Sequence, residues 1–205
     1  MEDLETIATN TRSYFIVENE LREKVLPLCR KVIQYSARAI RAVHRQEQEK
    51  AKHLLDSAHK LINDINHDLS ESGELLHSGF VHDAQKEFAE GCITLAVITE
   101  KNLPEPEKLG ISYAAYLNGL GEAIGELRRY ILDSLRRGDF SRCEELLDIM
   151  DDIHGILMTM DFPEAITHGL RRTSDATRSI IERTRGDLTI ALRQRELEIK
   201  LDNSP

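Results

Sequence analysis

Apolar residues along this chain recur with the period of an α-helix. They are spaced three or four positions apart over most of the sequence, and no stretch alternates strictly between apolar and polar residues as a half-buried strand does. Turn-forming residues interrupt the pattern at four places: Ser72–Gly73, Leu103–Pro106, Gly138–Asp139 and Asp161–Pro163. The pattern therefore predicts long helices joined by short turns.

The apolar period and these interruptions predict five or six long helices. They span approximately residues 3–46, 48–71, 78–101, 111–137, 140–158 and 163–200. Pro27 is expected to kink or divide the first helix, because proline lacks the N–H of an interior helical position. Short connections make neighbouring helices antiparallel. The predicted fold class is all-α: one domain, residues 1–205, formed by an antiparallel bundle of six to seven long helices.

The third predicted helix has the most apolar surface. Its second half, from Gly91 to Ile98, is apolar on every side. A helix of this kind is buried all round. We therefore expect it to be the central helix, with the others packed around it.

Charge and cysteine content narrow the possible functions. The chain has 27 Lys and Arg against 36 Asp and Glu, a net charge of −9, which is unusual for a generic nucleic-acid-binding domain. Three widely spaced cysteines argue against a disulfide framework or a zinc site. The first residues lack the features of a secretory signal, and no apolar run approaches the length of a membrane span. The expected location is the cytoplasm, with no membrane partner.

Four glutamates form the main candidate site. Glu87 and Glu90 are three apart in the third helix and lie inside an apolar sector, where an unpaired charge is costly. Glu122 and Glu126 are four apart in the fourth helix, next to glycines that permit close backbone approach. Four carboxylates from two neighbouring helices suit Mg²⁺ or Mn²⁺ better than zinc. Such an ion could activate water for attack on a phosphodiester.

Other interpretations of these residues remain open. A di-iron bundle needs a Glu-x-x-His motif, and positions 93 and 125 are Ile and Gly instead. Glu122 and Glu126 also fit a solvated face with Arg129 as an ion-pair partner, and Glu87 and Glu90 could pair with arginines of another helix.

A row of cations in the first helix is the second candidate site. Four of them recur every seven residues and a fifth lies beside the last two, so a continuous helix would carry all five along one face. We call this row the basic stripe: Lys24, Lys31, Arg38, Arg41 and Arg45. A stripe of this kind can follow a phosphate backbone, although it also fits a solvated face paired with nearby acids. No aromatic residues lie between the cations, so base stacking is not indicated.

Three segments resemble the translin superfamily, and specifically its TRAX (translin-associated factor X) branch. Residues 87–90, Glu-Phe-Ala-Glu, are similar to the Glu-aromatic-x-Glu of that branch. Residues 116–129, YLNGLGEAIGELRR, are similar to the family's Tyr-Leu-x-Gly-Val-x-Asp-Leu-Thr-Gly-Glu-Leu-x-Arg, and the same Gly-Asp turn follows at residues 138–139. Residues 21–44 are similar to the first helix of translin. The family motif has Asp where this chain has Glu122.

The resemblance implies an α-helical bundle that assembles into an octameric shell around an internal cavity. It implies binding of RNA and single-stranded DNA, and a metal-dependent endoribonuclease site inside the shell. Residue by residue, the catalytic and metal-ligating carboxylates fall on Glu87, Glu90 and Glu122, with Glu126 at the fourth acidic position. The basic stripe and Arg129 become the candidate nucleic-acid-binding residues.

The length of the chain leads to an expectation about the assembly. The chain lacks the long basic N-terminal extension and the acidic insert of larger TRAX proteins. This indicates a compact, prokaryotic-type member that builds a homo-octamer from one kind of subunit. Two functions remain in competition: an endoribonuclease that cleaves single-stranded RNA, and a translin-like shell that binds RNA or single-stranded DNA without cutting it. A helical bundle that binds another protein is a third interpretation.

Overall fold

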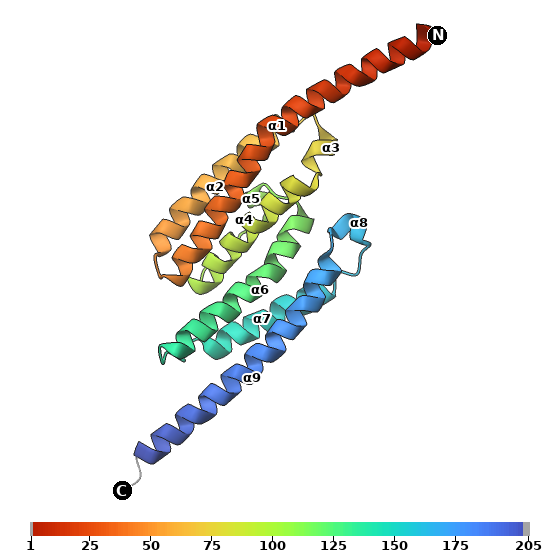
Figure 1. Ribbon diagram of the computed structural model, residues 1–205. Helices are drawn as coiled ribbons and strands as arrows, with labels where there is room; N and C mark the ends of the chain where they lie inside the picture. Colours follow the sequence, from red (N-terminus) through yellow and green to blue (C-terminus); the bar gives the residue numbers. More distant parts are fainter. Residues whose placement is uncertain (1, 203–205) are drawn as a thin grey trace.

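The computed structural model describes residues 2–202 (Figure 1). Over that range it contains nine helices and no strand, which confirms the all-α prediction. The six long helices are α1 (Glu2–His44), α2 (Gln48–Asp68), α4 (Gly79–Ile98), α6 (Tyr113–Arg136), α7 (Cys143–Met158) and α9 (Leu170–Asp202). Three single-turn helices lie in the connections: α3 (Gly73–Leu76), α5 (Pro106–Leu109) and α8 (Glu164–Thr167).

The expectation that Pro27 kinks or divides the first helix is wrong in one part: Pro27 does not divide the helix. Helix α1 is continuous through Pro27, which is exposed. On both sides of it, Val25, Cys29 and Val32 are buried in the core. Burial of these side chains offsets the loss of one hydrogen bond and the ring clash, which cost about 3 kcal/mol in a helix interior.

The last predicted helix starts later than expected. Residues 163–169 form the separate turn α8 and a break, and α9 begins at Leu170 rather than at residue 163. His168 and Gly169 have φ angles of 50° and 82°, in the left-handed region, so the backbone cannot pass through them as a right-handed helix.

The long helices form two groups of three. Helices α1, α2 and α4 pack together, as do α6, α7 and α9, and contact between α4 and α6 joins the two groups (Figure 1). Helix α4 therefore has α1, α2 and α6 as neighbours, which confirms its predicted central position. Its buried side chains include Phe88 and Ile93, and Gly91 lies against Leu55 of α2 and Ile40 of α1.

Helices α4 and α6 run parallel, which corrects the antiparallel expectation for this pair. Gln85 of α4 accepts a hydrogen bond from the backbone N–H of Ser112, just before α6 begins. Further along both helices, Ala89 lies against Gly119. The connection over residues 99–112 is long enough to return the chain to the starting end of α4, so successive turns of the two helices face one another in the same order.

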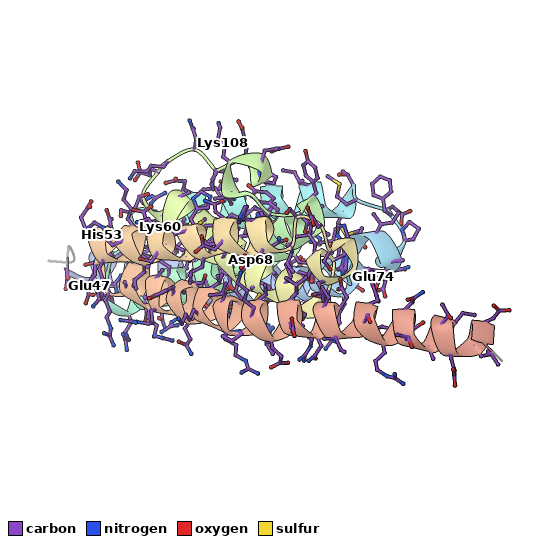
Figure 2. The ribbon with its side chains drawn as sticks, turned by 90° about the horizontal axis from the view of Figure 1, so that it is seen from above. Glu47, His53, Lys60, Asp68, Glu74 and Lys108 are labelled. Carbon is purple, nitrogen blue, oxygen red and sulfur yellow. The ribbon has the colours of Figure 1, made fainter. Side chains whose placement is uncertain are left out.

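The two terminal helices extend beyond the bundle at opposite ends (Figure 1). Residues 3–17 of α1 are exposed, and Figure 2 shows this part of the helix projecting beyond the other helices. In the same view Lys60 and the exposed His53 lie along the outer surface of α2, and Asp68, near its end, pairs with Lys24 of α1. No helix within residues 2–202 combines the length and the hydrophobicity needed to cross a membrane.

Candidate metal centre

The site begins with a close approach between α4 and α6 at Gly119. A Cβ atom at this position would lie 2.7 Å from both the Cβ of Ala89 and the carbonyl oxygen of Lys86, closer than such atoms approach in proteins. Only glycine permits this contact. It brings Glu122, one turn further along α6, next to the glutamates of α4.

Three of the four predicted glutamates meet at this contact. Glu87, Glu90 and Glu122 each offer a carboxylate oxygen, and these oxygens lie within 4.8 Å of one another. We call these three residues the carboxylate cluster. Glu90 is the most buried of them, with 9% of its surface exposed. The spacing in each helix and the parallel register of α4 and α6 together produce the cluster.

The cluster carries more negative charge than its surroundings neutralise. Burial, followed by the charges of Glu87, Glu122 and Glu126, raises the pKa of Glu90 to about 8. Burial and Glu122 also raise the pKa of Glu87 above its ordinary value. Lys86 donates a hydrogen bond of 2.8 Å to Glu122. One lysine does not balance three converging carboxylates, so the arrangement favours an added cation.

Glu126 is held apart from the cluster by α1. Its Oε2 lies 2.5 Å from Nε2 of His44, whose side chain is 4% exposed. Arg129 approaches the same oxygen at 3.8 Å. The hydrogen bond from His44 is the largest effect on Glu126 and lowers its pKa despite partial burial. The prediction that Arg129 could pair with Glu126 agrees with this geometry, whereas the role of His44 was missed.

The chemistry of the donors fits a hard divalent cation. All three groups of the cluster are carboxylates, the ligands that Mg²⁺ and Mn²⁺ prefer. A bound cation would also stabilise the ionised form of Glu90 against the burial and the neighbouring charges that raise its pKa. Two members, Glu90 and Glu122, line an open cleft of about 620 Å³ between α4, α6 and α9, so a substrate can reach them.

The basic stripe lies on exposed surface rather than at the cluster. All five of its side chains are exposed, and Lys24 forms an ion pair with Asp68 of α2 at 2.6 Å. Because α1 is continuous through Pro27, the first four cations lie on one unbroken helix, and Arg45 lies in the turn that follows it. His44, between Arg41 and Arg45 in the sequence, contacts the carboxylate of Glu126 on α6.

Comparison with solved structures places this geometry in a known family. AfC3PO in complex with duplex RNA superposes with a TM-score of 0.85 and 31% sequence identity, over 92% of this chain and 97% of that chain. C3PO is the component 3 promoter of RISC, of the translin/TRAX family. This chain belongs to the translin/TRAX superfamily.

One further solved structure and one protein sequence are similar to this chain. Apo-NeC3PO superposes with a TM-score of 0.79 over 90% of this chain and 96% of that chain at 17% identity, which shows the shared fold alone. An uncharacterised protein of Methanocaldococcus jannaschii is 27% identical over 187 residues, 90% of this chain and 82% of that protein. No family model matches the sequence.

Within the superfamily, two features of this member bear on its site. The carboxylate cluster lies on α4 and α6, in the two segments that resemble the TRAX motifs, residues 87–90 and 116–129. Glu122, in place of the motif's aspartate, is one methylene longer, and its carboxylate still reaches the other two. Its hydrogen bond with Lys86 orients this longer side chain.

Proposed function

We propose that this protein is a metal-dependent endoribonuclease whose site is the carboxylate cluster. The observation that carries the proposal is the convergence of three carboxylate oxygens within 4.8 Å on the wall of an open cleft. Buried carboxylates with raised pKa values in a cleft are typical of functional sites. The RNA-processing function that the family implies makes RNA the substrate expected at such a site.

Each residue of the site has a proposed role. Glu87, Glu90 and Glu122 hold Mg²⁺ or Mn²⁺. When bound, the ion would supply an activated water and stabilise the negative charge that develops on the phosphodiester. Glu126 is a further ligand or the base that accepts a proton from water, and His44 keeps it ionised by hydrogen bonding. Arg129 orients Glu126 or a phosphate group.

The nucleic acid and the assembly are also part of the proposal. AfC3PO forms a complex with duplex RNA, so this chain is proposed to bind RNA, with single-stranded RNA as the substrate and single-stranded DNA as an additional ligand. The basic stripe supplies phosphate contacts. The protein is proposed to form a cytoplasmic homo-octamer whose internal cavity the carboxylates face.

The test is cleavage of labelled RNA, single-stranded and duplex, in Mg²⁺, Mn²⁺ or EDTA. The key variant is Glu90→Gln, which keeps the shape of the side chain and removes its charge. Glu144→Gln is the matched control, because Glu144 is exposed on α7, far along the chain from the cluster. We expect metal-dependent cleavage by the wild type and the control, and at least a hundredfold loss in Glu90→Gln. Cleavage that persists in Glu90→Gln would exclude this site.

A non-catalytic shell is the second candidate function. Two of the four glutamates already have cationic or hydrogen-bonding partners, Lys86 for Glu122 and His44 for Glu126. This partial neutralisation is also expected of carboxylates that only stabilise a fold. RNA binding in the absence of cleavage with every metal would support this candidate.

A further inference from the structure

The cleft next to the carboxylate cluster has a second, basic wall. Its acidic residues, Asp83, Glu90 and Glu122, come from α4 and α6. The opposite side is formed by the break before α9 and by the first turn of that helix, with His168 and Arg172, and His82 of α4 lies against it.

Two of these residues form a stacked pair across the cleft. The imidazole rings of His82 and His168 lie 4.4 Å apart between centroids, with an angle of 16° between their planes. His168 reaches this position because its backbone is left-handed, an uncommon and strained conformation for a residue other than glycine. The pair also lines a neighbouring cavity of about 500 Å³, which is lined by Tyr113 as well. The two histidines therefore lie between this cavity and the cleft.

A buried asparagine holds the strained turn in place. Asn118, 3% exposed, donates a hydrogen bond of 2.9 Å to the carbonyl oxygen of Thr167. Its side-chain oxygen accepts a hydrogen bond of 2.8 Å from the hydroxyl of Thr173. These bonds fix the residues on both sides of His168 to α6, the helix that carries Glu122. The basic wall is thus positioned relative to the carboxylate cluster and does not depend on a free loop.

The charge on this wall is available to a ligand. Lys86 lines the same cleft but is engaged by Glu122, whereas Arg172 forms no ion pair with any residue in the range 2–202. Burial, and then the neighbouring His168, lowers the pKa of His82, which favours the neutral ring, and a neutral imidazole can donate one hydrogen bond. A guanidinium with adjacent imidazole donors matches the oxygens of a phosphodiester.

We propose that His82, His168 and Arg172 form a phosphate-binding subsite, which holds a phosphodiester of the RNA strand next to the one at the carboxylate cluster. This inference rests on the proposed function, because it assumes that RNA enters the cleft. Without a bound cation, the three acids repel phosphate on their side of the cleft. A strand that crosses it is therefore held by the basic wall, which sets the position of the neighbouring phosphodiester relative to Glu90 and Glu122.

Adjacent arginines on α9 provide a matched test. Arg172 lines the cleft, whereas Arg171 lines a separate cavity formed by residues of α7 and the segment that follows it. We would measure the affinity for labelled single-stranded RNA in EDTA over a range of salt concentrations. All variants would carry Glu90→Gln, so that cleavage cannot interfere. Arg172→Ala should weaken binding about tenfold and make the salt dependence shallower by about 0.7 in logarithmic slope, and Arg171→Ala should change neither.

A substitution of His168 tests the stacked pair separately. Asparagine tolerates the left-handed conformation better than most residues, so His168→Asn removes the imidazole while the turn is kept. We expect about a fivefold loss of RNA affinity with an unchanged melting temperature.

The possible outcomes separate this inference from the proposed function. Equal affinities and equal salt slopes for Arg172→Ala and Arg171→Ala, in a protein that binds RNA, would overturn the subsite alone. Absence of RNA binding by the parent protein at every salt concentration would overturn the proposed function and the subsite together. A selective effect of Arg172→Ala would support the subsite even if the protein cleaves no RNA.

Discussion

Among single residues, Glu90 carries the least compensated charge of the site. It is nearly buried, and the cation closest to the cluster, Lys86, is bonded to Glu122. Glu126, in contrast, has the hydrogen bond from His44 and a depressed pKa. Glu90 on α4 and Glu126 on α6 thus have opposite electrostatic environments. The difference arises from the neighbouring helices, since both residues are glutamates on helices of the same bundle.

The raised pKa of Glu90 predicts a pH-dependent change in stability. A glutamate in the unfolded chain titrates near 4.5, whereas Glu90 in the folded protein titrates near 8. The stabilising effect of the bound proton is complete below pH 4.5 and is lost progressively as the pH rises to about 8. In EDTA, we expect Glu90→Gln to match the wild type at pH 4.5 and to melt several degrees higher at pH 8.5, corresponding to a few kcal/mol.

Thermal unfolding across this pH range, monitored by circular dichroism, provides the measurement. The variant Glu144→Gln, altered on the exposed surface of α7, should follow the wild-type curve. Addition of Mg²⁺ at pH 7 should raise the melting temperature of the wild type more than that of Glu90→Gln, because a ligand stabilises the state that binds it. Parallel pH curves for the wild type and Glu90→Gln would contradict the assignment of a buried, uncompensated carboxylate.

At the scale of helices, the contact between α4 and α6 determines whether the site forms. Gly119 permits the two backbones to touch, and Glu122 reaches Glu87 and Glu90 only at this separation. Gly125, six residues later on the same helix, has open space where a Cβ would lie. The two glycines therefore have different roles, although both belong to the motif that resembles TRAX.

Alanine substitutions should distinguish these two glycines. Gly119→Ala introduces a methyl group against Ala89 and the backbone of Lys86, so we expect a loss of about 1–3 kcal/mol of unfolding free energy and a large loss of RNA cleavage. Gly125→Ala should gain about 0.5–1 kcal/mol from helix propensity and keep its activity. Urea denaturation and the cleavage assay measure the two effects. Equal free energies of unfolding for the two variants would show that the fold does not require the close contact at Gly119.

The continuity of α1 gives a second prediction at this scale. Because Arg38 and Arg41 of the basic stripe are exposed on the continuous helix α1, Arg38→Glu combined with Arg41→Glu should weaken RNA binding at least tenfold and flatten its salt dependence. The control is Lys52→Glu combined with Lys60→Glu, which makes the same charge change on the exposed surface of α2. Fluorescence anisotropy with labelled RNA measures both. An equal loss in the two double variants would indicate a general effect of net charge.

At the scale of the whole molecule, the ends of α1 and α9 project from the bundle and expose large apolar side chains. The projecting part of α1 includes exposed Ile7, Phe15 and Ile16, and the end of α9 includes exposed Leu197 and Leu201. Large apolar side chains gathered on a projecting helix are typical of surfaces that contact another protein. The proposed octamer would cover them.

Charge in the projecting part of α1 should therefore disrupt self-association. We expect Ile7→Asp combined with Phe15→Asp to lower the molar mass measured by size-exclusion chromatography with light scattering, with unchanged helicity, because both side chains are exposed in the subunit. Thr9→Asp combined with Ser13→Asp adds the same charge to the same segment and serves as the control. A wild-type protein that elutes as a monomer at micromolar concentration would contradict the proposed assembly.

Local patterns in the sequence determined the helices and the pairs of glutamates. The apolar period depends on residues that are close in the sequence. It therefore predicted most ends of the long helices to within a few residues. The surface of α4 that is apolar on every side predicted its central position, and the three-residue spacing placed Glu87 and Glu90 on one face. The exceptions, Pro27 and the start of α9, depend on contacts with other helices and on a left-handed turn.

Only the tertiary structure decided which of these residues meet. The parallel register of α4 and α6 joins Glu122 to the cluster, and packing of α1 brings His44 to Glu126, 82 positions away in the chain. Tertiary packing also brings the imidazole ring of His168 onto that of His82. Helical periodicity specifies the face on which a side chain lies but not the partner of that face. The partner is selected by close packing over long sequence separations, as at Gly119, where one missing methyl group allows two backbones to touch.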